Sequence, residues 1–353
     1  MTERKRILFL GGALNQTKIA HAVSRHLEDD YETWFSPFYA DSLLLGTAQR
    51  ARLLDWTALG GRFKEMSLDY LSDVGARVDD GGSRNSYDLV VTTSDLILQK
   101  NLAEVPTVLL QEGMTDPENL MYHVVTKLRL PRYLASTSTN GLSHSYDYFC
   151  VASEGYKDHF TAKGVPGEKL VVTGLPHWDD FATTVDGSSF PHEGYVLVAT
   201  SDARETMKLE YRKRFLRRAV RIANGRPMIF KLHPNEQRER ATREINQVAP
   251  DALVLSEGDI NPMIANCDEL ITQYSTVVYT GMALGKPCHS YFEMDELGRL
   301  MPMQNAGTSA ARMADVCRHV LERRGLPDRR ALVDVCACRD CDAGAIELHS
   351  AAG

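Results

Sequence analysis

Short apolar runs and longer amphipathic stretches alternate along most of the chain. The runs that favour buried strands are 6–10, 87–92, 107–110, 148–152, 170–173, 195–200, 228–232, 253–255, a run ending near residue 272, and 289–292. The intervening stretches at 17–27, 154–163, 205–224 and 310–323 have apolar residues at helical spacing. Buried strands alternating with helices are typical of α/β proteins with parallel sheets. The sequence therefore predicts an α/β fold.

One polar stretch divides this pattern in two. Residues 183–193 (TTVDGSSFPHE) contain glycine and proline and show no periodicity, as expected of a linker. The full length of 353 residues is long for one hydrophobic core and suits two domains. We predict an N-terminal domain at 1–182, a C-terminal domain at 194–330, and a cysteine-containing tail at 331–353.

The stretch 268–287 (DELITQYSTVVYTGMALGKP) predicts a strand, a polar corner and a short helix that Gly285 ends. Ser275 is the expected N-cap. Helix N-termini carry unpaired N–H groups and partial positive charge, so they bind anions readily. Gln273, Ser275 and Thr276 are therefore candidate phosphate ligands, although an ordinary capped helix would have the same pattern.

Two further strands of this half end in polar residues. Lys231 lies inside the strand 228–232 and His233 follows it, and Pro234 then turns the chain away. Arg204 follows the strand 195–200. Ligands of open parallel sheets bind at the carboxyl edge of the strands, so we expect these three cations to lie near the candidate phosphate ligands.

The N-terminal half offers two corners of the same kind. Gly12 and Asn15 follow the first strand, where the glycines allow a sugar or acceptor to approach the backbone; the full Gly-x-Gly-x-x-Gly spacing of a dinucleotide site is missing. Glu112 and Gly113 follow the strand 107–110, and a half-buried carboxylate on such a corner is suited to general-base chemistry. An ordinary loop glutamate explains the same residues equally well.

Composition narrows the class of protein. A net charge of −7 and a pI near 5.9 give no electrostatic case for nucleic acid. No stretch approaches the roughly 18 apolar residues of a membrane span, and the N-terminal run is too short for a signal peptide. We expect a cytoplasmic protein, with peripheral membrane attachment left open. The basic amphipathic segment 121–133 could meet an anionic acceptor or a membrane surface, or could be a solvated helix face.

The seven cysteines include one cluster, Cys336, Cys338 and Cys341, with His349 nearby. Such a set can bind zinc, but a single cluster without a second half is a weak signal, and a frayed tail is the expected state. No Asp-x-Asp metal motif stands out. We therefore predict no metal site and no cofactor.

Three motifs together resemble the GT-B glycosyltransferase superfamily. They are the Gly-x-Pro-x-x-Asp turn at Gly174, Pro176 and Asp179, the Lys-x-His-Pro corner at Lys231, and the strand followed by Tyr-Ser-Thr at 274–276. The chain is most similar to CDP-glycerol glycerophosphotransferases and capsule polysaccharide transferases, and also looks like UDP-N-acetylglucosamine 2-epimerases. The resemblance implies two Rossmann-like domains whose parallel sheets face each other across a cleft.

The resemblance also implies roles for the candidate residues. Ser275 and Thr276 would bind the phosphates of a nucleotide, Lys231 or His233 would stabilise the departing diphosphate without a metal, and Arg204 would assist. Glu112 would deprotonate an acceptor hydroxyl. The residues that would line the donor or acceptor cleft are Gly12, Asn15, Gly113, Gly174 and His177. The corner departs from the pattern of the glycerophosphotransferases, which have a histidine where this chain has Glu112.

The function expected from this set is glycosyl transfer from a nucleotide sugar, UDP- or CDP-linked, to a glycan, lipid or other envelope acceptor. Epimerisation of a UDP-sugar is the first alternative and needs acid and base groups on both faces of the sugar, for which Glu112, Asp95 and His177 are available. A catalytically idle module that binds a nucleotide sugar is the second alternative.

Overall fold

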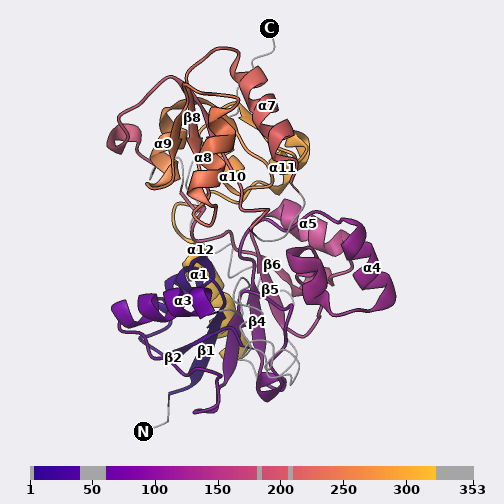
Figure 1. The fold of residues 1–353 in the computed structure, drawn as a ribbon. Coiled ribbons are helices and arrows are strands. Elements are labelled where there is room, and N and C mark those ends of the chain that lie inside the picture. Colours follow the sequence, from indigo (N-terminus) through magenta and orange to yellow (C-terminus); the bar gives the residue numbers. More distant parts are fainter. Residues whose placement is uncertain (1–3, 40–60, 181–184, 206–209, 323–353) are drawn as a thin grey trace.

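The computed structural model describes residues 4–39, 61–180, 185–205 and 210–322, and these form two parallel sheets, each flanked by helices (Figure 1). The first sheet has the order β2-β1-β3-β4-β5-β6 and the second the order β11-β10-β7-β8-β9. The strands are β1 (Arg6–Gly11), β2 (Glu32–Pro37), β3 (Leu89–Thr92), β4 (Thr107–Leu110), β5 (Tyr148–Val151), β6 (Leu170–Val172), β7 (Tyr195–Ala199), β8 (Met228–Lys231), β9 (Leu253–Leu255), β10 (Cys267–Ile271) and β11 (Cys288–His289). All neighbouring strands pair in parallel.

The apolar runs form strands because both faces of each sheet are covered. In β1, Ile7 and Phe9 belong to one hydrophobic cluster while Leu8 and Leu10 belong to another. Successive side chains of a strand point to opposite faces, so a strand between two helical layers must be apolar throughout. The α/β prediction is thereby confirmed.

Helices connect the strands. They are α1 (Leu14–Ser24), α3 (Gly61–Asp73), α4 (Leu120–Leu128), α5 (Glu154–Ala162), α7 (Arg212–Ala223), α8 (Arg238–Asn246), α9 (Ile260–Asn266), α10 (Val277–Ala283), α11 (Met294–Leu300) and α12 (Ser309–Glu322). Short 3₁₀ helices lie at η1 (Lys100–Leu102), η2 (Arg132–Thr139), η3 (Gly167–Lys169) and η4 (Gly187–Ser189). Within the described residues, no helix combines the length and the apolar character needed to cross a bilayer.

The last described helix returns to the first sheet. α12 packs against α1, β3 and β4, and its buried residues, such as Met313 and Cys317, share a core with residues of β1 and β5. The last helix of the predicted C-terminal domain, 194–330, therefore packs against the N-terminal half. The cysteine cluster of the predicted tail lies outside the described residues.

The two halves meet through aromatic side chains. Tyr279 of α10 places its hydroxyl oxygen 3.1 Å from that of Tyr156 on α5, and its ring lies edge-on to Trp178 with centroids 5.3 Å apart. All three residues are buried in the larger core. This joint fixes the first turn of α10 close to the N-terminal half.

The described part of the predicted linker is attached to the second half. Asn266, the last residue of α9, donates its side-chain amide to the carbonyls of Gly187 and Phe190 at 3.0 and 2.9 Å. Residues 183 and 184 lie outside the described part of the chain.

Candidate active site

Glu112 follows β4 directly and is joined to the first glycine turn by one side chain. The amide of Gln16 donates a hydrogen bond to the Glu112 carboxylate. The carbonyl oxygen of the same amide accepts from the backbone N–H groups of Gly12 at 2.7 Å and Ala13 at 3.0 Å. Gln16 is 7% exposed, so its amide is fixed, and it holds Glu112 at the carboxyl edge of the sheet between β1 and β4.

The position of Glu112 changes its acidity. Burial raises the pKa of its carboxyl group to about 7, the nearby charge of Asp116 acts in the same direction, and the hydrogen bond from Gln16 opposes them. A group whose pKa lies near neutral pH is present in both protonation states and can accept or give a proton efficiently. The corner therefore has the chemistry expected of a general base.

Gly113 places this corner directly against the second half. A Cβ atom added to Gly113 would lie 3.7 Å from the methyl carbon of Thr276 and 3.9 Å from the Trp178 ring. Thr276 is the N-cap of α10, in helical conformation and without a side-chain capping bond. The cap expected at Ser275 is therefore displaced by one residue. The residue that follows Glu112 thus lies against the start of α10.

Gln273 links two strand ends of the second sheet. Its amide oxygen accepts a hydrogen bond from the Ser201 hydroxyl at 2.9 Å, and its backbone carbonyl accepts from Ser290 at 2.8 Å. Gln273 is 4% exposed. Its side chain therefore supports the corner that carries Ser275 and Thr276.

His233 follows β8 at the same edge and is partly exposed. Its Nδ1 accepts from the backbone N–H of Asn235 at 3.2 Å and lies 3.5 Å from an Asp202 carboxylate oxygen. The Asn235 amide in turn donates to Asp202 at 2.9 Å. Because Nδ1 accepts a hydrogen bond, the proton of the neutral ring resides on Nε2. His233 is thus oriented to donate from Nε2.

The other two predicted cations are engaged inside the second half. Lys231 is 6% exposed, and its ammonium group donates to the carbonyls of Ser256 at 3.1 Å and Leu232 at 3.4 Å. Arg204 forms two hydrogen bonds with Glu244, at 2.8 and 2.9 Å, and an ion pair with Glu210 at 3.0 Å. These contacts give both residues a structural role inside the second half, in place of the predicted phosphate contact.

Gly174 and Asp179 anchor α12. Gly174 has a φ of +79°, and a Cβ on it would lie 2.1 Å from the Ser309 hydroxyl oxygen. Asp179 accepts from the Ser309 backbone N–H at 2.9 Å and from the Ser309 hydroxyl. The predicted cleft residue Gly174 instead permits close packing of α12 on this turn.

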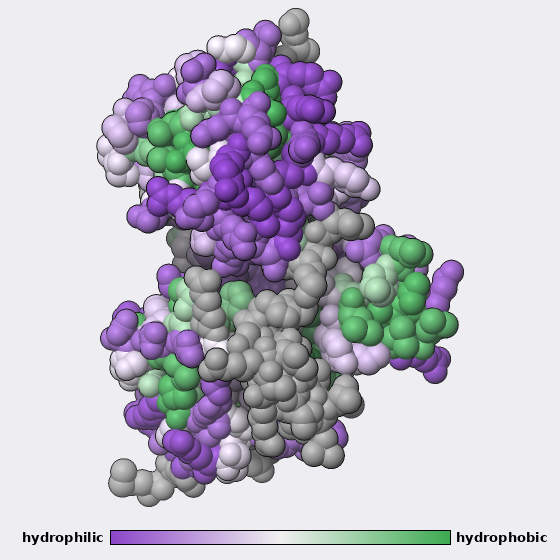
Figure 2. Space-filling model, viewed as in Figure 1, coloured by the Kyte–Doolittle hydropathy of each residue, from purple (hydrophilic) through white to green (hydrophobic). Residues whose placement is uncertain are grey.

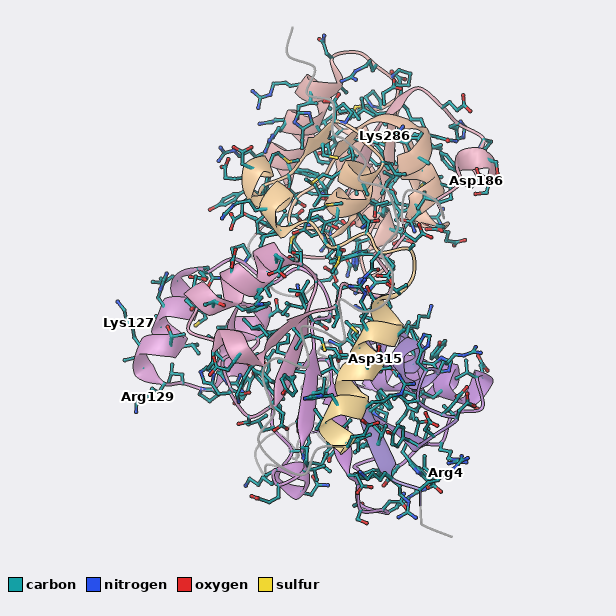
Figure 3. The ribbon with its side chains drawn as sticks, turned by 180° about the vertical axis from the view of Figure 1, so that it is seen from behind. Arg4, Lys127, Arg129, Asp186, Lys286 and Asp315 are labelled. Carbon is teal, nitrogen blue, oxygen red and sulfur yellow. The ribbon has the colours of Figure 1, made fainter. Side chains whose placement is uncertain are left out.

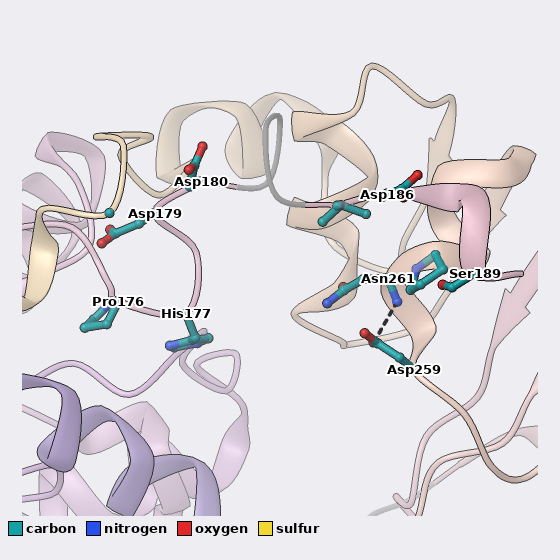
Figure 4. A pocket seen from close by; sticks show the side chains of 11 residues that line it. Pro176, His177, Asp179, Asp180, Asp186, Ser189, Asp259 and Asn261 are labelled. Carbon is teal, nitrogen blue, oxygen red and sulfur yellow. Dashed lines mark hydrogen bonds between the residues drawn. The ribbon is translucent and has the colours of Figure 1, made fainter.

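His177 faces a different space. It lines a cavity of about 530 Å³ between the halves, opposite Asp259 and Asn261 (Figure 4). Asp179, Asp180 and Asp186 line the same cavity, which includes neither Glu112 nor His233. Four carboxylates disfavour a diphosphate, so we do not place a nucleotide there.

Asp95, a candidate acid or base for epimerisation, is buried and held by contacts within the N-terminal half. It is 1% exposed, forms an ion pair with Arg132 at 2.8 Å, and accepts from the backbone N–H groups of Gly141 and Ser143, both at 2.9 Å. These contacts hold the loops around η2 together. Asp95 therefore has a structural role and is not available as an acid or base for epimerisation.

Asn15 is exposed in the first turn of α1, near the glycine turn, so it stays available to the cleft. Among the residues that the structure describes, no group of three or more His, Cys, Asp or Glu side chains could hold a metal ion. Cys336, Cys338, Cys341 and His349 lie outside those residues.

Gln16, Asp202 and Asn235 are not among the site residues predicted from the sequence. Gln16 occupies the third position of α1, where a glutamine commonly reaches back to the backbone at the helix start, and this spacing is visible in the sequence. Nothing local in the sequence signals that Asp202 approaches His233, because the two follow different strands.

Comparison with known proteins identifies the architecture. No protein-family model matches the chain, and no curated protein matches it in sequence. Among solved structures, MnaA of S. aureus with UDP matches with a TM-score of 0.54 and 10% identity, over 92% of this chain and 99% of that one. The UDP-GlcNAc 2-epimerase of Neisseria meningitidis bound to UDP-GlcNAc gives 0.52 and 12%, over 90% and 100%. The wall teichoic acid polymerase TagF gives 0.51 and 11%, over 90% and 89%.

These similarities extend over nearly the whole chain and establish that the fold is GT-B. The solved structures similar to this chain include UDP-GlcNAc 2-epimerases and TagF, which belong to the groups that the sequence motifs resemble.

Proposed function

We propose that this chain is a GT-B enzyme that transfers a glycosyl or sugar-phosphate-like group from a UDP- or CDP-linked donor to a hydroxyl of a glycan, lipid or other envelope acceptor. The observation that carries the proposal is the position of Glu112, whose pKa burial raises to about 7, beside Gly113, which faces Thr276 of the second half. A base on one half and a helix start on the other are the two parts that this reaction requires.

The donor would bind to the second half, with its phosphates at the start of α10. Thr276 and Ser275 offer hydroxyl and backbone N–H groups there, and His233 offers Nε2–H from the end of β8, at the same edge of the sheet. The solved structures of similar fold with UDP, UDP-GlcNAc and CDPG support a nucleotide-linked ligand for this chain. Gln273 and Lys231 would hold the surrounding loops.

In the reaction, the acceptor hydroxyl attacks the anomeric carbon of the sugar while Glu112 removes its proton. The bond from that carbon to the diphosphate oxygen breaks, and the diphosphate leaves with the electron pair. His233 and the α10 N-terminus would stabilise the charge that develops on it. The Gln16 amide keeps the Glu112 carboxylate oriented toward the acceptor.

Transfer accounts for the geometry better than epimerisation. Epimerisation needs an acid and a base on opposite faces of one carbon, and of the three side chains considered for it, Asp95 is buried in structural contacts and His177 faces the acidic cavity. Of these three side chains, only Glu112 is available as an acid or base at the corner after β4. Transfer requires only one base.

A two-stage experiment tests the proposal. First, thermal unfolding is followed with UDP, CDP, GDP, CMP and their sugar conjugates, because a ligand at a hundred times its Kd stabilises the folded state by roughly 2.7 kcal/mol. The stabilising nucleotide sugar is then incubated with and without candidate glycan and lipid acceptors. Nucleotide release that depends on an acceptor supports transfer. Conversion of the donor sugar without an acceptor supports the epimerase alternative, and tight binding without either reaction supports the idle module.

A further inference from the structure

A cluster of large apolar side chains lies exposed on and beside α4. The most exposed are Leu120 at 80% and Leu128 at 66%. The other members of this cluster, which we call the α4 patch, are Leu98, Met121, Leu130 and Leu134. Figure 2 shows the patch as a green area on the part of the molecule that carries α4. Contiguous apolar surface of this kind marks an interaction site in soluble proteins.

The apolar surface of α4 is wider than the stripe of an ordinary surface helix. Tyr122 and Val125 form the buried side, which packs on the N-terminal half. Leu120, Val124 and Leu128, at intervals of four residues, form a second row, whose ends are the two most exposed leucines. Packing within the described residues therefore accounts for the first side only.

The patch is basic within an acidic protein. Between residues 120 and 134 the sequence has one lysine, two arginines and no acidic residue, although the whole chain has a net charge of −7. Lys127 and Arg129 are exposed and project from the outer end of this segment (Figure 3). Arg129 ends α4 with a φ of 52°, a left-handed conformation that turns the chain between Leu128 and Leu130.

A groove of about 640 Å³ runs beside the helix. Its walls include Leu96, Leu98 and Leu130, and Arg129 and Arg132 are also among its lining residues. The charge of Arg132 is paired with Asp95, so Arg129 is the cation that the groove offers to a ligand. Aliphatic walls next to cationic groups match a phospholipid, which has acyl chains next to an anionic phosphate.

We propose that the α4 patch docks on the surface of a phospholipid bilayer that contains anionic lipids. The leucines enter the boundary between headgroups and acyl chains, while Lys127 and Arg129 pair with lipid phosphates. A second copy of the chain is a poorer partner because a symmetric contact would bring two basic segments together. The inference goes beyond the proposed function and does not depend on the chemistry of the cleft.

Flotation of the full chain with vesicles tests this inference. The vesicles consist of phosphatidylcholine alone or of phosphatidylcholine mixed with phosphatidylglycerol. We expect the protein to float with the mixed vesicles, less with phosphatidylcholine alone, and progressively less as salt rises. Lys127→Gln with Arg129→Gln should weaken binding roughly 30-fold, because each cation near the surface contributes about 1 kcal/mol. Leu120→Ser with Leu128→Ser should weaken it at least about tenfold.

Matched control variants test whether vesicle binding depends on the α4 patch or on exposed apolar and basic residues in general. Met66→Ser removes an exposed apolar side chain on α3, and Arg238→Gln with Arg243→Gln removes two exposed cations on α8; both should bind vesicles like the unchanged protein. Absence of binding to mixed vesicles overturns the proposal, and so does binding that the patch variants leave unchanged. If light scattering shows a dimer that the patch variants dissociate, the face is instead a contact between copies and the proposal is also overturned. Nucleotide binding, measured on the same variants, should not change.

Discussion

Gly113 of the N-terminal half lies against Thr276 of the C-terminal half, so close that a Cβ on Gly113 would lie 3.7 Å from the threonine methyl carbon. The two residues belong to the corners after β4 and β10, each at the carboxyl end of its strand. Their approach brings Glu112 next to the start of α10. The proposed function depends on this relationship more than on any single residue.

Substitutions at Gly113 test the need for space between these corners. The φ of Gly113 is not positive and 3.7 Å is an ordinary contact, so Gly113→Ala should leave kcat/KM within about threefold of its original value. Gly113→Leu should fill the gap and lower kcat/KM about 100-fold, since a displacement of about 1 Å can have that effect. Steady-state kinetics with melting temperatures of both variants provides the check. Equal activity of the two variants would show that no substrate passes this point.

The Tyr156 and Tyr279 pair tests how firmly the halves are joined. Their hydroxyl groups are buried and 3.1 Å apart. Either single change to Phe should lower the free energy of unfolding by about 1–2 kcal/mol, because the remaining hydroxyl loses its partner. The double change should cost less than the sum of the two single changes. Denaturant unfolding of the four proteins measures this coupling, and strict additivity would mean that the hydroxyl groups do not interact.

Substitution of Asp95 tests whether this residue has a structural or a catalytic role. Asp95→Ala leaves Arg132 without its buried partner, so the free energy of unfolding should fall by about 3 kcal/mol. Below the lowered melting temperature, kcat/KM and its pH dependence should stay as they are. A large loss of turnover with unchanged stability would return Asp95 to the reacting groups and would favour epimerisation.

Lys231 at the end of β8 and His233 two residues later should behave differently. His233→Ala should weaken nucleotide binding at least about tenfold, because a hydrogen bond to a charged group contributes about 1.5–3 kcal/mol. Lys231→Met should lower stability and leave the nucleotide Kd unchanged, because Lys231 donates to backbone carbonyls. Calorimetric titration of both variants tests this difference. His192→Ala, an exposed histidine of the linker, is the matched control and should bind as the unchanged protein does.

The sheets were largely predictable from the sequence because each strand is buried on both faces and appears as an apolar run. β2 (ETWFSP) was overlooked, since only its second half is buried. The position of α12 was not predictable. Its apolar side indicates that it packs on a sheet but not on which one, and the contacts that decide this involve Asp179, 130 residues away from Ser309.

A site residue was predictable where the residues next to it in the sequence determine its position. Glu112 and His233 each follow a strand, so their place at the sheet edge can be read from the adjacent residues. Arg204 has the same position after a strand, yet its partner Glu244 is 40 residues further along. Sequence alone cannot show whether such a cation meets a ligand or an acidic side chain of the same domain.

The pH dependence of kcat/KM for the unchanged protein and for Glu112→Gln tests the central claim most directly. Only the deprotonated carboxylate can accept the acceptor proton, and the pKa of Glu112 is about 7. The rate should therefore rise with pH up to about 7 and then level off. Gln16→Leu removes a hydrogen bond that lowers this pKa, so it should move the rise to higher pH. Glu112→Gln should lower kcat/KM by about 10²–10⁴-fold with the nucleotide Kd unchanged. Turnover that survives in Glu112→Gln with the same pH dependence would contradict the account.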